Sequence, residues 1–334
     1  MTSAPTPWRL GTRRSALATA QSQQVADALS AASGRDVVLV PITSEGDVSR
    51  ASLSSLGGQG VFATRLREAL AAGECDLLVH SLKDLPTAPA PGLVIAAIPS
   101  RVDARDVVIT RDGTELHDLP VAATVGTGSP RRRAQALASN PQLDVRDIRG
   151  NVDSRLSRVR SGELDAVILA AAGISRLGAD GRPVTDGLHL EYLDLNEWPT
   201  APGQGALAIE TRVDAQSDLR AALGELDHAE TRAAVDAERA VLAGLDAGCH
   251  APVGVHATLD GDEVRLNAMV YALDGKKSIG LDETTPLGSG YARKSGSGDG
   301  AEAADGATSD ARARGVGEDV ARRLLERGAA DLAP

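Results

Sequence analysis

Short apolar runs alternate with helical patterns along the first two thirds of the chain. Strand-like runs at 36–42 and 76–82 flank a helical pattern that carries Leu66 and Leu70 on one face. Such alternation is typical of an α/β fold with mainly parallel sheets. A further run at 206–212, ALAIETR, has the pattern of a strand that returns to the first sheet. We therefore predict an α/β fold.

A second α/β unit is expected to begin near Asp106. Its strands are predicted at 106–110, 121–125, 144–149 and 165–170. Ser129 and Asn151 precede helical patterns and suit N-cap positions, and Pro130 suits the first position of its helix. Two such domains joined by two crossing segments are expected to enclose a cleft.

The pattern changes after residue 225. A helix at 229–243 is followed by alternating strands, which indicates a small α+β domain. Residues 287–315 are rich in Gly, Ser, Ala and Asp, and we interpret them as a flexible insertion before a last helix that ends near Gly328. The predicted domains are residues 1–104 with 203–224, residues 105–202, and residues 225–334.

Charge is distributed unevenly along the chain. The whole sequence has a formal net charge of -11, yet residues 126–160 hold eight arginines against three aspartates, a net of plus five. Two arginine-rich runs, at 126–133 and 146–160, each have the pattern of a strand, a Gly-containing turn and a helix, which suits anion binding. The alternative is a solvated helix face. A local cluster in an acidic chain argues against nucleic-acid or anionic-membrane partners and favours a small polyanion.

The cysteines and the hydropathy pattern indicate the cellular compartment of the protein. The longest apolar run, at 166–174, is too short to span a bilayer, and the N-terminus has no apolar signal core. Cys75 and Cys249 lie in different sequence contexts, so we expect no disulfide. These features predict a cytoplasmic protein, and we expect it to be a monomer.

Asp84 is the strongest single candidate for a catalytic residue. It directly follows the apolar strand at 76–82 and precedes Pro86, and ligands of α/β sheets bind at the carboxyl ends of strands. A simple turn aspartate before a proline is the alternative. His80, on the same strand, is expected to be a packed core histidine.

Cys249 lies in a predicted loop, AGCHAP, without apolar neighbours to bury it, which favours an accessible thiol. Cys75 starts a predicted core strand and is expected to be a small buried hydrophobe. His250 and His256 near Cys249 match no strong ligand spacing, so we predict no metal site.

An ordered set of motifs gives the chain a specific resemblance. From Leu10 to about Gly280, and in the final helix, it resembles the porphobilinogen deaminase family, also called hydroxymethylbilane synthases. The resemblance is carried by LGTRRSALATAQ, GGQGVF, DLLVHSLKDLPT, VGTGSPRRRAQ, IRGNVDSRL, ILAAAGISRLG, APGQGALAIE and AGCHAPVG. It implies two domains similar to type II solute-binding proteins and a small α+β third domain that carries the cofactor cysteine.

The resemblance implies a transferase of tetrapyrrole and heme biosynthesis. Cys249 would hold a dipyrromethane cofactor through a thioether, and four porphobilinogen units would add to it stepwise. Each unit would lose ammonia to give an electrophilic azafulvene, and water would finally release the linear tetrapyrrole hydroxymethylbilane. Asp84 would accept hydrogen bonds from pyrrole N–H groups and stabilise cationic intermediates.

Each pyrrole carries an acetate and a propionate, which gives the arginines their implied task. Besides Cys249 and Asp84, the residues implied to contact the cofactor are Ser81, Lys83, Thr127, Ser129, Arg131 and Arg132. Those implied to contact substrate are Arg13, Ser15, Phe62, Arg149, Arg155, Arg176 and Gln204.

Two features depart from the family pattern. Gln59 occupies a position that is often lysine, and the 287–315 insertion has no counterpart, so we expect it to be dispensable for chemistry. A non-catalytic two-domain binding protein for a small organic polyanion is the alternative function, since the same cleft and arginines would serve it. Such a binder would need neither Cys249 nor Asp84. Nucleic-acid binding ranks last.

Overall fold

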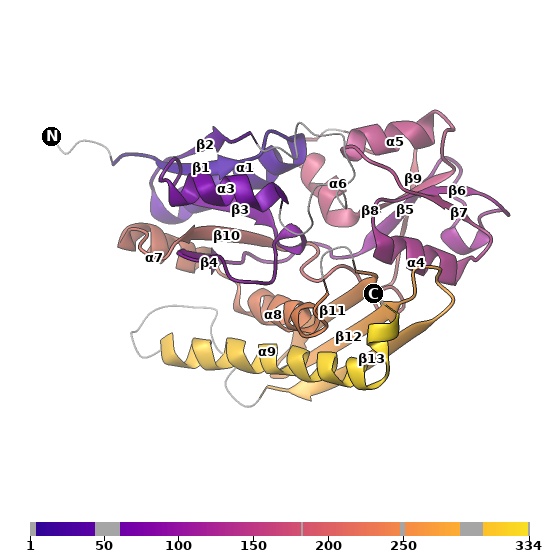
Figure 1. Ribbon diagram of the computed structural model, residues 1–334. Coiled ribbons are helices and arrows are strands. Elements are labelled where there is room, and N and C mark those ends of the chain that lie inside the picture. The colour runs from indigo at the N-terminus through magenta and orange to yellow at the C-terminus, as the bar shows by residue number, and fades with distance from the viewer. Residues whose placement is uncertain (1–4, 44–60, 182, 248–250, 288–302, 333–334) are drawn as a thin grey trace. The chain divides into compact units, whose positions relative to one another are not determined.

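The computed structural model describes residues 5–43, 61–181, 183–247, 251–287 and 303–332. The chain forms two compact units, the first made of Met1–Arg101 with Ala206–Arg232 and the second of Val102–Gly205 with Ala233–Pro334 (Figure 1). The division into three domains stays a prediction. No helix among the described residues is long and apolar enough to cross a membrane.

The first unit is built on a five-stranded sheet of order β2-β1-β3-β10-β4. Its strands are β1 (Trp8–Thr12), β2 (Val37–Pro41), β3 (Leu77–Ser81), β4 (Leu93–Ala97) and β10 (Leu207–Arg212). β1 pairs in parallel with β2 and β3, whereas β10 is antiparallel to both of its neighbours. The expected return of residues 206–212 to this sheet is thereby confirmed.

Helices cover both faces of the first sheet. Helices α1 (Ala16–Ser33) and α7 (Ser217–Leu226) pack on one face, where Leu29 and Leu219 contact the strands. Helix α3 (Val61–Ala71) packs on the other face through Leu66 and Leu70. Ser15 caps α1, its Oγ accepting a hydrogen bond from Ala18 N at 3.3 Å.

The second unit contains a sheet of the same design, with order β7-β6-β8-β5-β9. Its strands are β5 (Asp106–Thr110), β6 (Thr124–Gly126), β7 (Asp144–Arg146), β8 (Ala166–Ala170) and β9 (His189–Tyr192). β6 is parallel to β7 and β8, and β5 is antiparallel to β8 and β9. Helices α4 (Pro130–Ser139) and α5 (Val152–Arg160) lie on opposite sides of this sheet, and α6 (Ala171–Leu177) follows β8 directly (Figure 1).

The α/β fold class and the four predicted strands of the second unit are confirmed, although β6 begins three residues later and β7 ends three residues earlier than expected. Ser129 and Asn151 are the N-caps of α4 and α5, as predicted. The expectation of mainly parallel sheets is wrong. In each sheet a strand from a distant part of the sequence, β10 or β5, inserts in the antiparallel direction, so half of the pairings are antiparallel.

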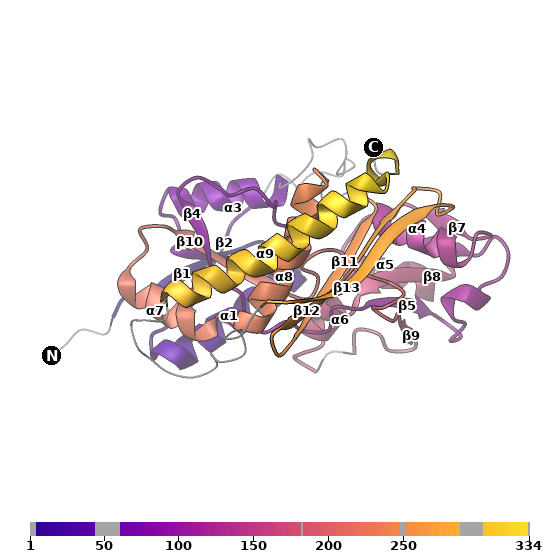
Figure 2. The ribbon, with the colours of Figure 1, turned by 90° about the horizontal axis from the view of Figure 1, so that it is seen from below.

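A third, antiparallel sheet belongs to the second unit. It consists of β11 (Val253–Asp260), β12 (Glu263–Tyr271) and β13 (Ser278–Pro286), and it packs against α8 (Ala229–Gly244) and α9 (Ala303–Glu326) (Figure 2). The two helices approach closely at Gly317, where an added Cβ would lie 2.1 Å from Ala237 O. Gly328 follows α9 with a φ of 90°, so the predicted helix stop is confirmed.

The predicted flexible insertion is wrong for residues 303–315, because α9 already begins at Ala303. Five alanines lie in this segment, and alanine is the strongest helix former: Ala303, Ala304, Ala307, Ala311 and Ala313. Ala313 is fully buried in the core between α9 and the third sheet, so tertiary packing adds to that preference. Residues 288–302 lie outside the described residues.

Candidate functional site

Asp84 lies where the buried strand β3 ends. A 3₁₀ turn at Leu82–Asp84 follows the strand, and Leu82 and Leu85 on either side of the acid are buried. Leu82 N donates to Ala206 O at 3.1 Å, which ties the turn to the segment before β10. The buried leucines fix the backbone, and Asp84 is left exposed to solvent.

Polar groups support the strand that leads to Asp84. Ser81 is half-buried, and Gln21 of α1 donates to its Oγ through Nε2 at 3.0 Å. His80 is buried, as expected, with Nε2 3.4 Å from Glu210 Oε2. Burial alone would raise the pKa of Glu210, but His80 and the Arg67 guanidinium outweigh it and lower that pKa. The carboxylate is therefore charged, and it links β10 to His80 of β3 and to Arg67 of α3.

The other predicted residues of the first unit lie at the start of its helices. Arg13 is half-buried just before α1, and Ser15 is the α1 N-cap. Lys83 is half-buried beside Asp84. Phe62 is in the first turn of α3, but its side chain lies outside what the structure describes, as do Cys249, His250 and the loop with Gln59.

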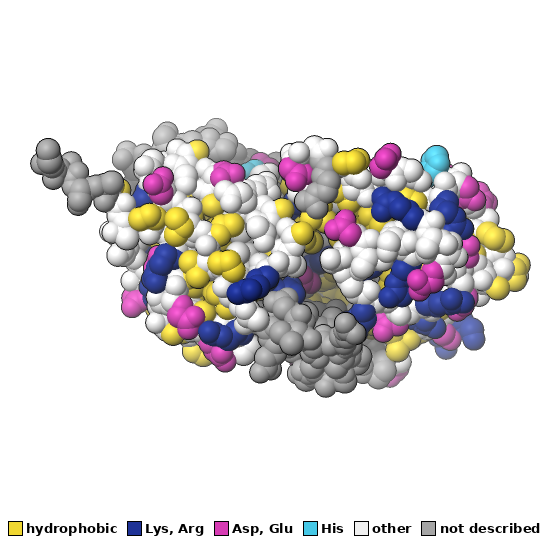
Figure 3. All heavy atoms as spheres, turned by 90° about the horizontal axis from the view of Figure 1, so that it is seen from above, with side chains coloured by type: hydrophobic (Ala, Val, Ile, Leu, Met, Phe, Trp, Pro, Cys, Tyr) yellow, Lys and Arg dark blue, Asp and Glu magenta, His cyan; other side chains and the backbone are white. Residues whose placement is uncertain are grey.

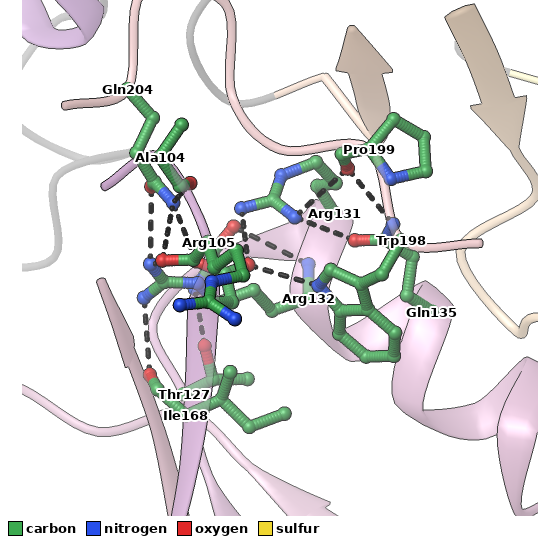
Figure 4. Close-up of polar contacts among 12 residues, drawn as sticks. Ala104, Arg105, Thr127, Arg131, Arg132, Gln135, Ile168, Trp198, Pro199 and Gln204 are labelled. Carbon is green, nitrogen blue, oxygen red and sulfur yellow. Dashed lines mark hydrogen bonds and ion pairs between the residues drawn. The ribbon is translucent and has the colours of Figure 1, made fainter. Parts of the chain in front are cut away.

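Asp106, the first residue of β5, is the centre of a buried polar cluster in the second unit. Figure 4 shows its partners Arg131, Arg132, Trp198 and Gln204. Its Oδ2 accepts hydrogen bonds from Arg131 Nη2 and Trp198 Nε1, both at 2.9 Å. Its Oδ1 accepts from Arg132 Nη2 at 2.7 Å and from Gln204 Nε2 at 2.8 Å. Asp106 is completely buried, so four donors within the protein replace its hydration.

Electrostatics keep this carboxylate ionised. Burial alone would raise the pKa of Asp106, but the guanidinium groups of Arg131 and Arg132 outweigh burial, and the pKa lies well below its usual range. Burial also lowers the pKa of Arg131, and Asp106 partly offsets that effect. Two cations against one anion leave the cluster with a positive excess.

The turn between β6 and α4 explains why both arginines enter the interior. Ser129 Oγ accepts from Arg132 N at 3.4 Å and caps α4, and Thr127 Oγ1 accepts from Ser129 N at 3.2 Å. An added Cβ at Gly128 would lie 2.9 Å from Ile148 O, so this turn needs glycine. The first turn of α4 is thus set by local hydrogen bonds.

Arg149 and Arg155 flank a second turn. Gly150 has a φ of 114°, a backbone conformation that residues with a side chain rarely adopt. Its carbonyl oxygen accepts a hydrogen bond from Arg155 Nε at 2.9 Å. Burial, with contributions from Arg132 and Arg149, lowers the pKa of Arg155 to about 10. Basic side chains gather on the face of the second unit that carries α5 (Figure 3), and Arg158 and Arg160 lie in the last turn of this helix.

Arg176 is the predicted arginine that lies in α6. It is buried, and its Nη2 donates to Gly205 O at 2.8 Å. Burial lowers the pKa of Arg176 to about 10. Gly205 itself has a φ of 88°, and an added Cβ would lie 2.5 Å from Val102 O. The glycine of the APGQG motif therefore lets this segment approach both Val102 and Arg176.

Several of these arginines have a donor that nothing in the described part of the chain satisfies. The buried Nε atoms without a hydrogen-bond partner there belong to Arg131, Arg132, Arg149 and Arg176. A buried donor without an acceptor destabilises the fold, and a guanidinium pairs best with carboxylate or phosphate. The second unit is therefore suited to bind an organic anion that carries several such groups.

The structure brings some predicted residues together and leaves others unlinked. Arg131, Arg132 and Gln204 meet at Asp106, and Thr127 and Ser129 form the turn that presents them. Asp84 belongs to the other unit.

The sequence interpretation missed four residues: Asp106, Gln135, Trp198 and Tyr271. A carboxylate at the start of an otherwise apolar strand was the one available signal, and only for Asp106.

Two family models match the chain. The model described as "Porphobilinogen deaminase, dipyromethane cofactor binding domain" matches residues 8–220, and "Porphobilinogen deaminase, C-terminal domain" matches residues 232–292. Residues 8–220 contain every described residue predicted to bind cofactor or substrate.

Curated relatives match over most of their length. A porphobilinogen deaminase of Leifsonia xyli is 53% identical over 330 residues, covering 98% of this chain and 94% of the relative. A porphobilinogen deaminase 1 of Streptomyces coelicolor is 54% identical over 288 residues, covering 84% of this chain and 88% of the relative.

Among solved structures, the VFT2 domain of Bordetella pertussis BvgS aligns with a TM-score of 0.39 and 16% identity, covering 65% of this chain and 84% of that one. A Salmonella typhimurium periplasmic binding protein aligns with a TM-score of 0.38 and 15% identity, covering 66% of this chain and 93% of that one. Scores this low carry no conclusion about fold or function. The family models and the sequence relatives, in contrast, span nearly the whole chain, and it belongs to the porphobilinogen deaminase family.

Proposed function

We propose that this chain is a hydroxymethylbilane synthase. It joins four porphobilinogen molecules head to tail on a covalently bound dipyrromethane, releases ammonia at each addition, and frees the linear tetrapyrrole by hydrolysis. One observation carries the proposal beyond family membership: in the described residues, Arg131, Arg132, Arg149 and Arg176 each hold a buried Nε–H without an acceptor. The acetate and propionate groups of substrate and cofactor supply such acceptors.

These arginines fit a dipyrromethane because it carries the same carboxylates as the substrate. Arg131 and Arg132 are fixed by Asp106 on their Nη groups, so their Nε edges remain for a carboxylate. Thr127 and Ser129, in the turn before α4, together with Ser81 and Lys83 near Asp84, assist in holding the group. When bound through Cys249, the dipyrromethane supplies the covalently held pyrrole to which the first substrate unit is joined.

Arg149, Arg155 and Arg176 bind the carboxylates of incoming substrate, and Arg13, Ser15 and Phe62 contribute from the first unit. Burial lowers the pKa of Arg155 and of Arg176 to about 10, so both stay charged at neutral pH and both gain from pairing with an anion. Gln204 acts mainly through Arg132, since its Oε1 accepts from Arg132 Nη2 at 3.3 Å and its Nε2 donates to Asp106.

Asp84 is the catalytic carboxylate. Positive charge develops on the pyrrole nitrogen of the substrate as ammonia leaves, and a fixed carboxylate stabilises that charge and accepts the N–H hydrogen bond. The buried Leu82 and Leu85 hold the backbone of Asp84 while its side chain stays exposed, so the carboxylate is fixed yet accessible. It can also take up the proton that the ring carbon loses after each addition.

Intact-mass measurement of the purified protein tests the function. We expect the wild-type chain to be heavier than its sequence by one dipyrromethane, and Cys249→Ala to lack this adduct and all turnover. Cys75→Ala is the matched control, because Cys75 is fully buried and burial raises its pKa to about 11, so it is expected to keep the adduct.

A wild-type mass equal to the sequence would contradict the proposal and favour the non-catalytic binding protein.

We further propose a cytoplasmic monomer that binds neither nucleic acid nor membranes, given the formal net charge of -11. Native mass spectrometry of the same sample checks the oligomeric state, with the mass of one 34.3 kDa chain plus adduct expected.

A further inference from the structure

Tyr271 ends strand β12 and makes two hydrogen bonds in different directions. Its backbone N donates to Pro252 O at 3.0 Å, and Pro252 follows Cys249 by three residues in the sequence. Its hydroxyl oxygen accepts from Gln135 Nε2 of α4 at 3.2 Å. Tyr271 is 5% exposed, so neither bond competes with bulk water.

Gln135 forms hydrogen bonds with both Tyr271 and Arg131. Its Oε1 accepts from Arg131 Nη1 at 2.6 Å, and its Nε2 also donates to Pro199 O at 3.0 Å (Figure 4). Arg131 Nη2 in turn donates to Asp106. A continuous chain of buried hydrogen bonds therefore runs from the residue that holds Pro252 to the centre of the arginine cluster.

The donors and acceptors fix the orientation of the Gln135 amide. A guanidinium only donates, so Gln135 has to turn its oxygen toward Arg131. Its two N–H groups then need two acceptors, which are the Pro199 carbonyl and the Tyr271 hydroxyl. Without the hydroxyl, one buried N–H of Gln135 would lose its acceptor. The observed orientation of the amide would then be less stable.

Packing supports the same link. The turn that joins β12 to β13 lies directly on α4, where an added Cβ at Gly275 would be 2.6 Å from Ala134 O. Ala272 N donates to Lys277 O at 2.9 Å and closes this turn. Burial also raises the pKa of Tyr271, so its hydroxyl stays neutral at physiological pH. The hydroxyl is therefore held at a fixed distance from α4.

We propose that Tyr271 is a positioning residue that links the segment after Cys249 to Arg131. It would thereby hold the attached cofactor and the arginine that binds its carboxylate in fixed positions relative to each other. The inference rests on the proposed function, and it adds a residue that the family resemblance did not supply. Tyr271 acts through Gln135 and touches neither the cofactor nor the substrate.

The test follows the attachment of the cofactor to apoprotein supplied with porphobilinogen, with intact mass recorded over time. Tyr271→Phe keeps the ring and removes the hydroxyl. We expect about fivefold slower attachment, the effect of one neutral hydrogen bond, a similar fall in kcat, and a KM within about twofold of wild type. Tyr192→Phe is the matched control, since Tyr192 is an exposed tyrosine of the same unit and should leave all three quantities unchanged.

A double-mutant cycle separates positioning from a general loss of packing. Gln135→Met keeps the side-chain length without the amide, and we expect it to slow attachment at least as much as Tyr271→Phe. In the Gln135→Met background, Tyr271→Phe should then add no further effect. An unchanged attachment rate for Tyr271→Phe, or an equal slowing in both backgrounds, would overturn the inference.

The outcomes remain distinct from a failure of the proposed function. If wild-type protein acquires no adduct, the proposed function itself is wrong. If wild-type protein acquires it and Tyr271→Phe does so at the same rate, the function stands and the positioning role is refuted.

Discussion

Each unit has a carboxylate at one end of a strand of its sheet, and the two carboxylates differ in their exposure to solvent. Asp84 follows β3 of the first sheet and is exposed, whereas Asp106 begins β5 of the second sheet and is completely buried. Asp106 accepts four hydrogen bonds from its own chain. Asp84 is fixed through the backbone by buried leucines on either side.

This difference separates a residue available for chemistry from one that orients others. A carboxylate whose lone pairs are occupied by protein donors cannot accept a substrate N–H without breaking those bonds. Asp106 instead holds two guanidinium groups in place, and their Nε–H groups have no acceptor among the described residues. We therefore expect the accessible carboxylate to serve catalysis and the buried one to serve preorganisation.

Asp84→Asn is the strongest test of this comparison. Asparagine keeps the size of the side chain but cannot stabilise a positive pyrrole nitrogen or accept a proton, so we expect turnover to fall by about 100-fold or more. The free energy of unfolding should change by less than about 0.5 kcal/mol because the side chain is exposed. Porphobilinogen consumption and urea unfolding measure the two effects, and turnover near that of wild type would remove Asp84 from the catalytic role.

Asp106→Asn should give the opposite pattern. An amide cannot neutralise Arg131 and Arg132, and removing one partner of a buried ion pair costs about 3 kcal/mol or more. We expect this loss in the free energy of unfolding, together with weaker retention of the cofactor adduct. A variant as stable as wild type would show that the cluster is not held by its carboxylate.

The pH dependence of this second effect has a definite sign. The pKa of Asp106 is lower in the folded than in the unfolded chain, so its stabilisation is present above the unfolded value of about 4 and is lost as pH falls toward the folded value. The difference in unfolding free energy between wild type and Asp106→Asn should stay constant from about pH 7 to pH 5 and shrink below about pH 4.

Local features of this molecule were predictable from its sequence. The caps at Ser129 and Asn151 depend on neighbouring residues, and both are confirmed. The strand predicted at 76–82 is observed at Leu77–Ser81. The candidate arginines were likewise visible as a charge cluster. What each arginine contacts was not visible, because Asp106 is 25 residues from Arg131 and 92 residues from Trp198.

Long-range pairing explains the remaining differences. The direction of β5 and β10 depends on where the chain crosses between units, and apolar periodicity carries no information on strand direction. The helix at 303–315 was missed because its composition resembles a linker, whereas the buried Ala313 shows that packing on the third sheet favours the helix. The position of Asp84 at the end of β3 was predictable because it depends on one strand and one turn alone.

Trp198→Phe gives the smallest expected effect and isolates a single donor of the buried carboxylate. The change removes the hydrogen bond from Trp198 Nε1 to Asp106 Oδ2 but leaves both guanidinium groups. Hydrogen bonds to charged groups contribute about 1.5 kcal/mol or somewhat more.

Trp8→Phe is the matched control for ring size. Trp8 is equally buried, and its Nε1 has no hydrogen-bond partner among the described residues. Both substitutions remove the same atoms, so Trp198→Phe should lower the free energy of unfolding by about 1.5 kcal/mol more than Trp8→Phe does. Equal losses would mean that the two arginines and Gln204 compensate the burial of Asp106, and that the indole contributes packing rather than charge stabilisation.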